Sequence, residues 1–138
     1  ILLDLDEQEP DPQGELVLRV IAHPRYTNAL GDIYAGWLLD QMDQAAAQIA
    51  MRASGGRCAT VSLDNVDFVA PVPLGSEVSF YGELEDVGRS SMQIRIEVWI
   101  AEQGAEIYKS TETRFVFVAI DANGRIRSVP GHESSQMS

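Results

Sequence analysis

Apolar residues recur at spacings of three and four in one long stretch of the chain, residues 36–52. This period places them on a single face of an α-helix. The stretch is rich in alanine, which favours helix, and Gly55-Gly56 follows as a typical stop. At about 1.5 Å per residue, the helix would span roughly 25 Å and cross a small sheet. Its expected buried face comprises Leu38, Met42, Ala45, Ala46, Ile49 and Ala50.

Residues 92–100 follow a different pattern, a strict alternation of apolar and polar side chains. Because successive side chains of a strand point to opposite faces, this pattern predicts a half-buried strand of an antiparallel sheet. Trp99 falls on the polar side, where a large indole facing water would be unusual. We expect it either in a subunit contact or over a loop of its own chain.

Four further runs are typical of strands, with turn signals at Gly88-Arg89-Ser90 and Gln103-Gly104-Ala105. One strand, one helix and then four strands with mostly short connections cannot form a parallel sheet built throughout from crossover helices. The sequence therefore predicts an α+β domain with a five- to six-stranded antiparallel sheet around one long helix. The four runs are residues 16–22, 59–69, 77–87 and 107–120.

The two ends of the chain differ in composition from the middle. Residues 1–13 combine acidic side chains with prolines, and we expect an acidic disordered tail there. Residues 131–138 are polar and rich in serine, as frayed termini commonly are. Residues 14–130 are left as one domain with one core.

The chain has a formal charge of −11, and its basic residues are one lysine, Lys109, and nine arginines. This charge would repel a nucleic-acid backbone or an anionic membrane. No apolar run approaches the ~20 residues of a membrane span. We therefore expect neither partner, although arginines gathered locally could still bind a phosphorylated ligand. The lone Cys58 cannot form an intramolecular disulfide, so it fits the reducing cytoplasm and is read as a small buried apolar residue.

The segment 27–37, which leads into the helix, combines glycines with polar residues. Free N–H groups and the positive dipole end of a helix favour a ligand oxygen that bears negative charge, such as the oxyanion formed from a thioester carbonyl. Simple capping of the helix, with Asp32 near the first turn, explains the same residues. Both interpretations stand at this point.

Asp43 lies within the helical stretch on a mostly apolar face, among Leu39, Ala46 and Ala47. Partial desolvation and the nearby charge of Asp40 would both raise its basicity, which suits a general base. A solvated carboxylate at the edge of the face is the alternative. Other chemistries lack parts: the sequence holds no nucleophile elbow, phosphate loop or Cys/His metal spacing, and His23 and His132 are its only histidines. We read His23 as a structural or surface residue and expect no metal site.

A series of short motifs runs through residues 14–130: Thr27-Asn28, Gly31-Asp32-Ile33-Tyr34, Gly36-Trp37, Gln41-Met42-Asp43, Thr60-Val61, Pro71-Val72, Gly88-Arg89-Ser90-Ser91 and Glu97-Val98-Trp99. In these motifs the sequence resembles the YciA-like bacterial acyl-CoA thioesterases of the hotdog superfamily. The resemblance implies hydrolysis of acyl-CoA to a free acid and CoA, with no cofactor beyond the CoA of the substrate. It also implies a hotdog dimer with active sites at its interface, commonly assembled into a hexamer.

The resemblance also implies roles for single residues. Asp43 matches the catalytic aspartate and Asn28 the catalytic asparagine, supplied by opposing subunits. Asp43 would act on water as a general base, or attack the thioester directly, and amides near Ala35 and Gly36 would stabilise the oxyanion. The candidates for CoA binding are Arg57, Arg89, Ser90, Ser91 and Arg127.

Three positions depart from the family pattern: Leu30 replaces asparagine, Ala35 replaces glycine and His23 replaces an apolar residue. A less polar pocket is expected from Leu30, and a more restricted backbone approach from Ala35. Two rival functions remain, namely another hotdog enzyme such as a hydratase or dehydratase, and a non-catalytic acyl-CoA binding module.

Overall fold

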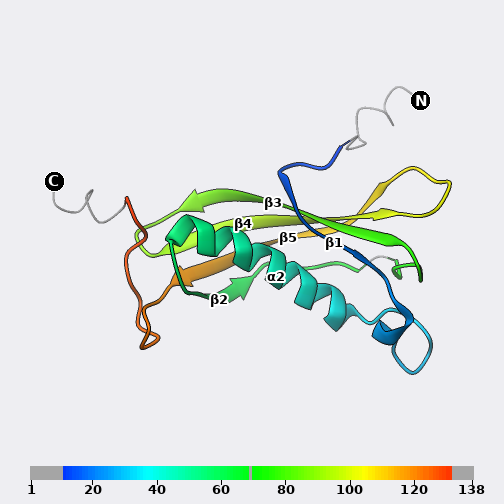
Figure 1. Ribbon diagram of the computed structural model, residues 1–138, viewed down its shortest axis with the longest axis horizontal. Coiled ribbons are helices and arrows are strands. Elements are labelled where there is room, and N and C mark those ends of the chain that lie inside the picture. The colour runs from blue at the N-terminus through cyan, green and yellow to red at the C-terminus, as the bar shows by residue number, and fades with distance from the viewer. Residues whose placement is uncertain (1–10, 69, 132–138) are drawn as a thin grey trace.

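The computed structural model describes residues 11–68 and 70–131, which form one antiparallel sheet and one long helix (Figure 1). The five strands lie in the order β1-β3-β4-β5-β2, and every neighbouring pair is antiparallel. The predicted α+β fold is confirmed, with five strands. The elements are β1 (Glu15–Ile21), η1 (Pro24–Tyr26), α2 (Ala35–Ser54), β2 (Cys58–Leu63), β3 (Glu77–Val87), β4 (Ser91–Ala101) and β5 (Tyr108–Ala119).

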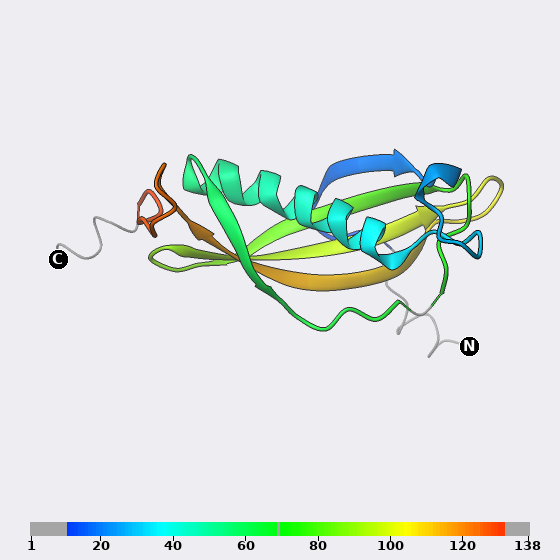
Figure 2. The ribbon, with the colours of Figure 1, turned by 90° about the horizontal axis from the view of Figure 1, so that it is seen from below.

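Helix α2 lies along one face of the curved sheet, and its buried side is the predicted one (Figure 2). Its last turn ends at Gly55, whose left-handed φ of 73° is a conformation that glycine adopts without strain. The helix comes very close to β3 at Gly82. A Cβ there would lie 2.4 Å from Ile49 Cδ1 and 2.9 Å from Ile96 Cδ1, so any larger residue would force the ends of these two side chains to shift.

Strand β4 carries the predicted alternation, and Met92, Ile94 and Ile96 are buried beneath the helix. On the opposite face of the sheet, Trp99 is only 3% exposed, and its Nε1 donates to Glu97 Oε1 at 2.9 Å. The same oxygen accepts the backbone N–H of Gln13 at 3.2 Å. The indole is therefore covered within a single chain, so no subunit contact is needed to explain its position.

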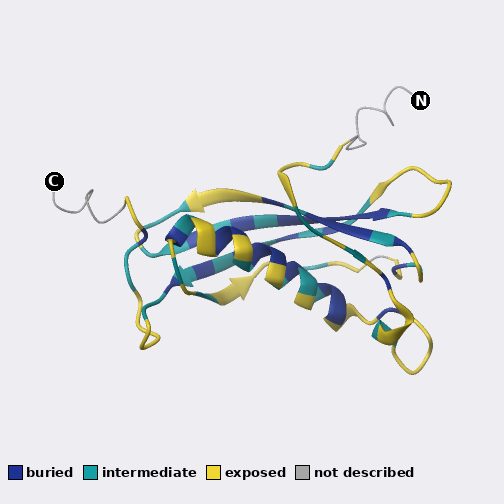
Figure 3. Cartoon of the chain, viewed as in Figure 1, coloured by how far each residue is buried: buried dark blue, intermediate teal, exposed yellow. Residues whose placement is uncertain are grey.

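The predicted strand 59–69 is shorter in the structure, because β2 ends at Leu63. Asp64 N still donates to Arg114 O at 3.0 Å, but from there the chain leaves β5. Exposed residues dominate β2 and the segment after it, in contrast to the buried centre of the sheet (Figure 3). Of the two predicted tails, residues 1–10 and 132–138 lie outside the described residues.

Candidate active site

The loop 27–34 is closed by Asn28. Asn28 Oδ1 accepts the N–H groups of Leu30 at 2.9 Å and Asp32 at 3.1 Å, and Asn28 N donates to Asp32 O at 2.7 Å. Since the side-chain oxygen is occupied in this way, the exposed amide keeps its NH₂ group, a donor, for a further partner. Leu30 lies at the loop tip and is 86% exposed.

Helix α2 begins without a side-chain cap. Tyr34 occupies the N-cap position and makes no side-chain capping hydrogen bond, and the first turn contains no acidic residue. The alternative interpretation, a cap provided by Asp32, is therefore wrong. The first N–H groups of a helix have no intrahelical acceptor, so the amides of Ala35 and Gly36 are available to a ligand. The space around Gly36 is ordinary, since a Cβ added there would lie 3.4 Å from its nearest neighbour, a carbon of the Tyr34 ring.

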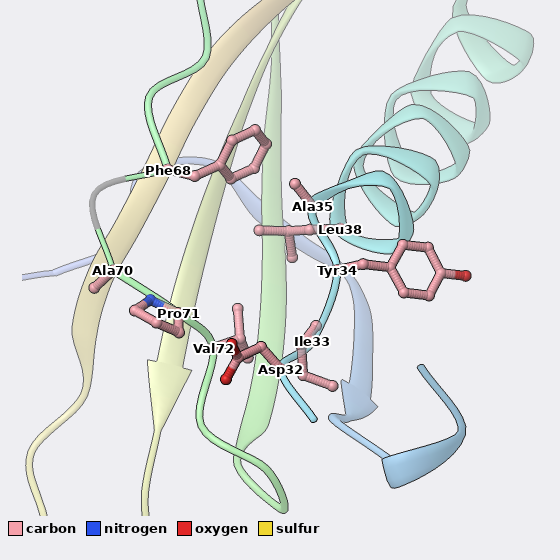
Figure 4. A pocket seen from close by; sticks show the side chains of 9 residues that line it. All are labelled: Asp32, Ile33, Tyr34, Ala35, Leu38, Phe68, Ala70, Pro71 and Val72. Atoms are coloured by element: carbon pink, nitrogen blue, oxygen red, sulfur yellow. The ribbon is translucent and has the colours of Figure 1, made fainter. Parts of the chain in front are cut away.

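A pocket of about 230 Å³ opens beside this helix start (Figure 4). Its lining is contributed by the loop before α2, the first turn of α2 and the segment before β3. The lining includes Ala35, whose amide is one of the two candidates for an oxyanion hole. Sequence reasoning did not assign the segment before β3 to the site: Phe68 was included in the predicted strand 59–69, and Pro71 and Val72 were given no role in the site. Apart from its two alanines and Tyr34, the apolar side chains of the pocket are Ile33, Leu38, Phe68, Pro71 and Val72.

Asp43 lies two turns further along α2 and is half-buried. Thr60 Oγ1, on β2, donates a hydrogen bond of 2.6 Å to Asp43 Oδ1. The carboxylate is therefore held on one side and keeps its second oxygen for another partner. No pattern in the sequence connects these two residues, since they are 17 positions apart and lie on different elements.

Asn28 and Asp43 do not meet within one chain. Asp43 lies eight residues beyond the helix start, which corresponds to about 12 Å along the axis. Asn28 lies in the loop before that start. A site that uses both groups on one thioester therefore requires two chains.

Three of the five candidate CoA-binding residues come together at the other end of the molecule. A second pocket, of about 250 Å³, is lined by Arg89, Ser90 and Arg127 together with Ile126 and Ser128. Arg89 is exposed. Ser91 lies in the same β3–β4 hairpin, where its carbonyl accepts from Gly88 N at 2.8 Å.

Arg127 is occupied by the fold itself. Its Nε donates to Ile120 O and its Nη1 to Ser54 O, both at 2.8 Å. Its Nη2 donates to Arg57 O at 3.1 Å. These contacts tie the C-terminal segment to the end of α2. Arg57 Nη1 donates to Ala122 O at 3.1 Å, so this side chain also has an acceptor within the protein.

Neither His23 nor Cys58 enters these pockets. His23 Nδ1 accepts the N–H of Arg25 at 3.0 Å and caps η1, which confirms its structural interpretation. Cys58 is a half-buried free thiol 3.4 Å from Ser54 Oγ. Among residues 11–68 and 70–131, no group of three His, Cys, Asp or Glu side chains could hold a metal ion. No helix in this part of the chain is long and apolar enough to cross a membrane.

Comparison with known proteins connects this architecture to a family. A family model described as the thioesterase superfamily matches residues 30–107. The acyl-CoA thioester hydrolase YciA of Salmonella typhimurium is 43% identical over 123 residues, which cover 86% of this chain and 92% of that protein. The YciA protein of Escherichia coli K12 is 42% identical, with 86% and 93% covered.

Solved structures agree. A hexameric broad-specificity acyl-coenzyme A thioesterase superposes with a TM-score of 0.84 at 38% identity, covering 92% of this chain and 90% of that one. A hexameric thioesterase from Yersinia pestis gives 0.83 at 43% identity, with 88% and 99% covered. The long helix on a five-stranded antiparallel sheet is thus the hotdog fold. The chain belongs to the thioesterase superfamily, among the YciA-like acyl-CoA thioester hydrolases.

Proposed function

We propose that this protein hydrolyses acyl-CoA with Asp43 as a general base. Asp43 takes a proton from water, and the hydroxyl oxygen bonds to the thioester carbon. The C–S bond then breaks as the protonated carboxyl returns its proton to the leaving sulfur, which releases the acid and the CoA thiol. The observation that carries the proposal is the hydrogen bond from Thr60 Oγ1 to Asp43 Oδ1. It orients a half-buried carboxylate and leaves its second oxygen for water.

The helix start supplies the electrostatic part of the mechanism. Amides of Ala35 and Gly36 are free of a side-chain cap and would donate to the oxyanion that forms on the carbonyl. The apolar pocket beside Ala35 would receive the acyl chain. Asn28 would use its NH₂ group to orient water or the carbonyl oxygen, because its own oxygen already accepts two N–H groups.

Two chains are needed for this arrangement. In one chain the first pocket is lined by the start of α2. The β3–β4 turn and the segment 126–128, which line the second pocket, lie beside the other end of the helix (Figure 2). A dimer with antiparallel helices would bring the Asn28 loop of one chain towards Asp43 of the other. We therefore propose a homodimer as the active unit, and a hexamer as the assembly, because hexameric relatives superpose closely.

The CoA part of the substrate would bind at the end of α2. Arg89 and Ser90 line the pocket there with free or exposed polar groups and are the proposed phosphate ligands, with Ser91 and Arg57 at its margin. Arg127 would act as a positioning residue, since its guanidinium is held by three backbone carbonyls. The free thiol of Cys58 fits the proposal that the enzyme works in the reducing cytoplasm.

A related enzyme supports the pairing of Asp43 with Thr60. Structures of the acyl-CoA hydrolase from Staphylococcus aureus, 26% identical, include an alanine variant of an aspartate and one of a threonine 17 residues further along. Asp43 and Thr60 have the same separation here. The same hydrolase was solved with butyryl coenzyme A.

The test is release of free CoA thiol from butyryl-CoA by wild type, Asp43→Asn and Asn28→Ala. Replacing the base should lower kcat by about 100-fold or more. Asp40→Asn is the matched control, because Asp40 lies on the same helix, is exposed and bonds only to glutamine side chains among the described residues. Wild-type turnover by Asp43→Asn would refute the mechanism. No turnover by the wild type would favour a binding module.

A further inference from the structure

The pocket at the start of α2 contains one charged side chain, Asp32. The other eight lining residues are Ile33, Tyr34, Ala35, Leu38, Phe68, Ala70, Pro71 and Val72, so no cationic group accompanies it. The backbone of Asp32 takes part in the Asn28 loop through its N–H and carbonyl. Its carboxylate makes no hydrogen bond or ion pair with any of the described residues.

The side chain of Asp32 is directed into the pocket that would receive the acyl chain. In the close view, its carboxylate points towards Pro71 and Val72, whereas the ring of Tyr34 points away from them (Figure 4). Asp32 and Ala35 line the same pocket of about 230 Å³. A short acyl group whose carbonyl is held by the amide of Ala35 would therefore extend its distal end along a wall that carries a negative charge.

We propose that Asp32 determines acyl specificity by excluding acyl groups with a distal carboxylate. Asp32 is itself exposed, but a bound acyl chain would displace water from the pocket, where like charges a few ångströms apart repel each other. A neutral acyl chain meets no such repulsion and contacts Leu38, Phe68 and Val72. The substrate class of this enzyme is therefore acyl-CoA with a neutral acyl group, and CoA esters of dicarboxylic acids are rejected. The inference rests on the proposed hydrolysis.

The experiment compares two probes of nearly identical shape, succinyl-CoA and its terminal amide. For the wild type, kcat/KM for the amide should exceed that for succinyl-CoA by about ten-fold or more. Asp32→Asn should reduce this ratio by a similar factor. Asp32→Glu keeps the charge and should retain the preference, and Glu106→Gln, which removes an exposed charge from the β4–β5 hairpin, should leave the ratio unchanged.

Equal hydrolysis of the two probes by the wild type would overturn the inference, and so would an unchanged ratio in a folded Asp32→Asn variant. The wild-type comparison decides the question even if that variant fails to fold. Hydrolysis of butyryl-CoA is measured in parallel. If the wild type does not hydrolyse butyryl-CoA, the proposed function is contradicted. If it hydrolyses butyryl-CoA but does not distinguish succinyl-CoA from its amide, only the role of Asp32 is contradicted.

Discussion

Thr60 and Asp43 are joined by a 2.6 Å hydrogen bond between the edge strand β2 and the central helix. Thr60→Val keeps the shape of the side chain and removes its donor. We expect kcat for acyl-CoA to fall by about ten-fold, because the carboxylate loses the contact that orients it. The free energy of unfolding should change little, since Thr60 is exposed. Thr60→Ser, which keeps the hydroxyl, should retain most of the activity. An unchanged kcat in Thr60→Val would show that this contact is only structural.

Mixing two inactive variants tests whether the site is shared between chains. Asp43→Asn and Asn28→Ala should each lose activity in the homodimer. A mixed dimer assembles one intact site from the unsubstituted Asp43 of one chain and the unsubstituted Asn28 of the other. Unfolding and refolding the two variants together should therefore restore up to about a quarter of wild-type thiol release, as random pairing gives half mixed dimers with one intact site each. The absence of any recovery, with mixed dimers detected by mass, would place both groups in the same chain.

The close approach of helix to sheet predicts that a substitution at Gly82 lowers the stability of the fold. Gly82→Ala would place a Cβ 2.4 Å from Ile49 Cδ1 and should destabilise the protein by about 1–3 kcal/mol through overpacking. Gly36→Ala is the matched control, since its Cβ would meet only the Tyr34 ring at 3.4 Å or more. Denaturant unfolding measures both. Equal stabilities of the two variants would contradict the packing argument.

Arg127 and Arg89 line the same pocket, but they should behave differently when replaced. Arg127→Met removes three charge-assisted hydrogen bonds to carbonyls and should lower the free energy of unfolding by about 2–4 kcal/mol. Arg89→Gln should leave the Tm nearly unchanged and raise KM for acyl-CoA. Thermal unfolding and steady-state kinetics on both variants separate support of the fold from contact with the ligand. If KM for acyl-CoA is unchanged in both variants, this pocket is not part of the CoA site.

The ion pairs of Glu85 should make the stability of the fold depend on pH. The hydrogen bond from Arg114, followed by that from Arg95, holds the pKa of this carboxyl below its usual 4.5. A group with a lowered pKa in the folded state stabilises the protein above the unfolded pKa, and this contribution disappears as the pH falls through the folded pKa. The Tm difference between wild type and Glu85→Gln should therefore be largest above pH 5 and shrink below about pH 4.5. Glu106→Gln serves as the charge control, and a difference that stays constant with pH would contradict the assignment.

The sequence predicted the parts of the fold that depend on local periodicity. The helix begins at Ala35, one residue before its predicted start, and the alternation around Ile94 and Ile96 identified β4 with its correct face. The end of β2 at Leu63 was missed, because Phe68 is apolar for a different reason: it lines a pocket. Periodicity cannot distinguish a residue that faces a core from one that faces a cavity.

The candidate site was predicted through family resemblance and only in part. Asp43, Ala35 and the Arg89 hairpin occupy positions that suit their expected roles, but these roles remain predictions. Thr60 could not be found from the sequence, because its contact with Asp43 depends on how the β2 edge lies against the helix. The contacts of Arg127 were hidden for the same reason, since its acceptors Ser54 and Ile120 are brought together only by the fold.

The two ends of α2 differ in how their terminal backbone groups are hydrogen-bonded. At its last turn, Arg127 and the left-handed Gly55 satisfy the terminal carbonyls from within the protein. At its first turn, no side chain of the described residues caps the free amides. Mutational tolerance should follow this asymmetry. Random substitutions near the end of the helix would be removed by selection for folding, whereas those near its start would survive as stable proteins with altered turnover. New substrate preferences should therefore arise from the loop that contains Asn28 and Asp32.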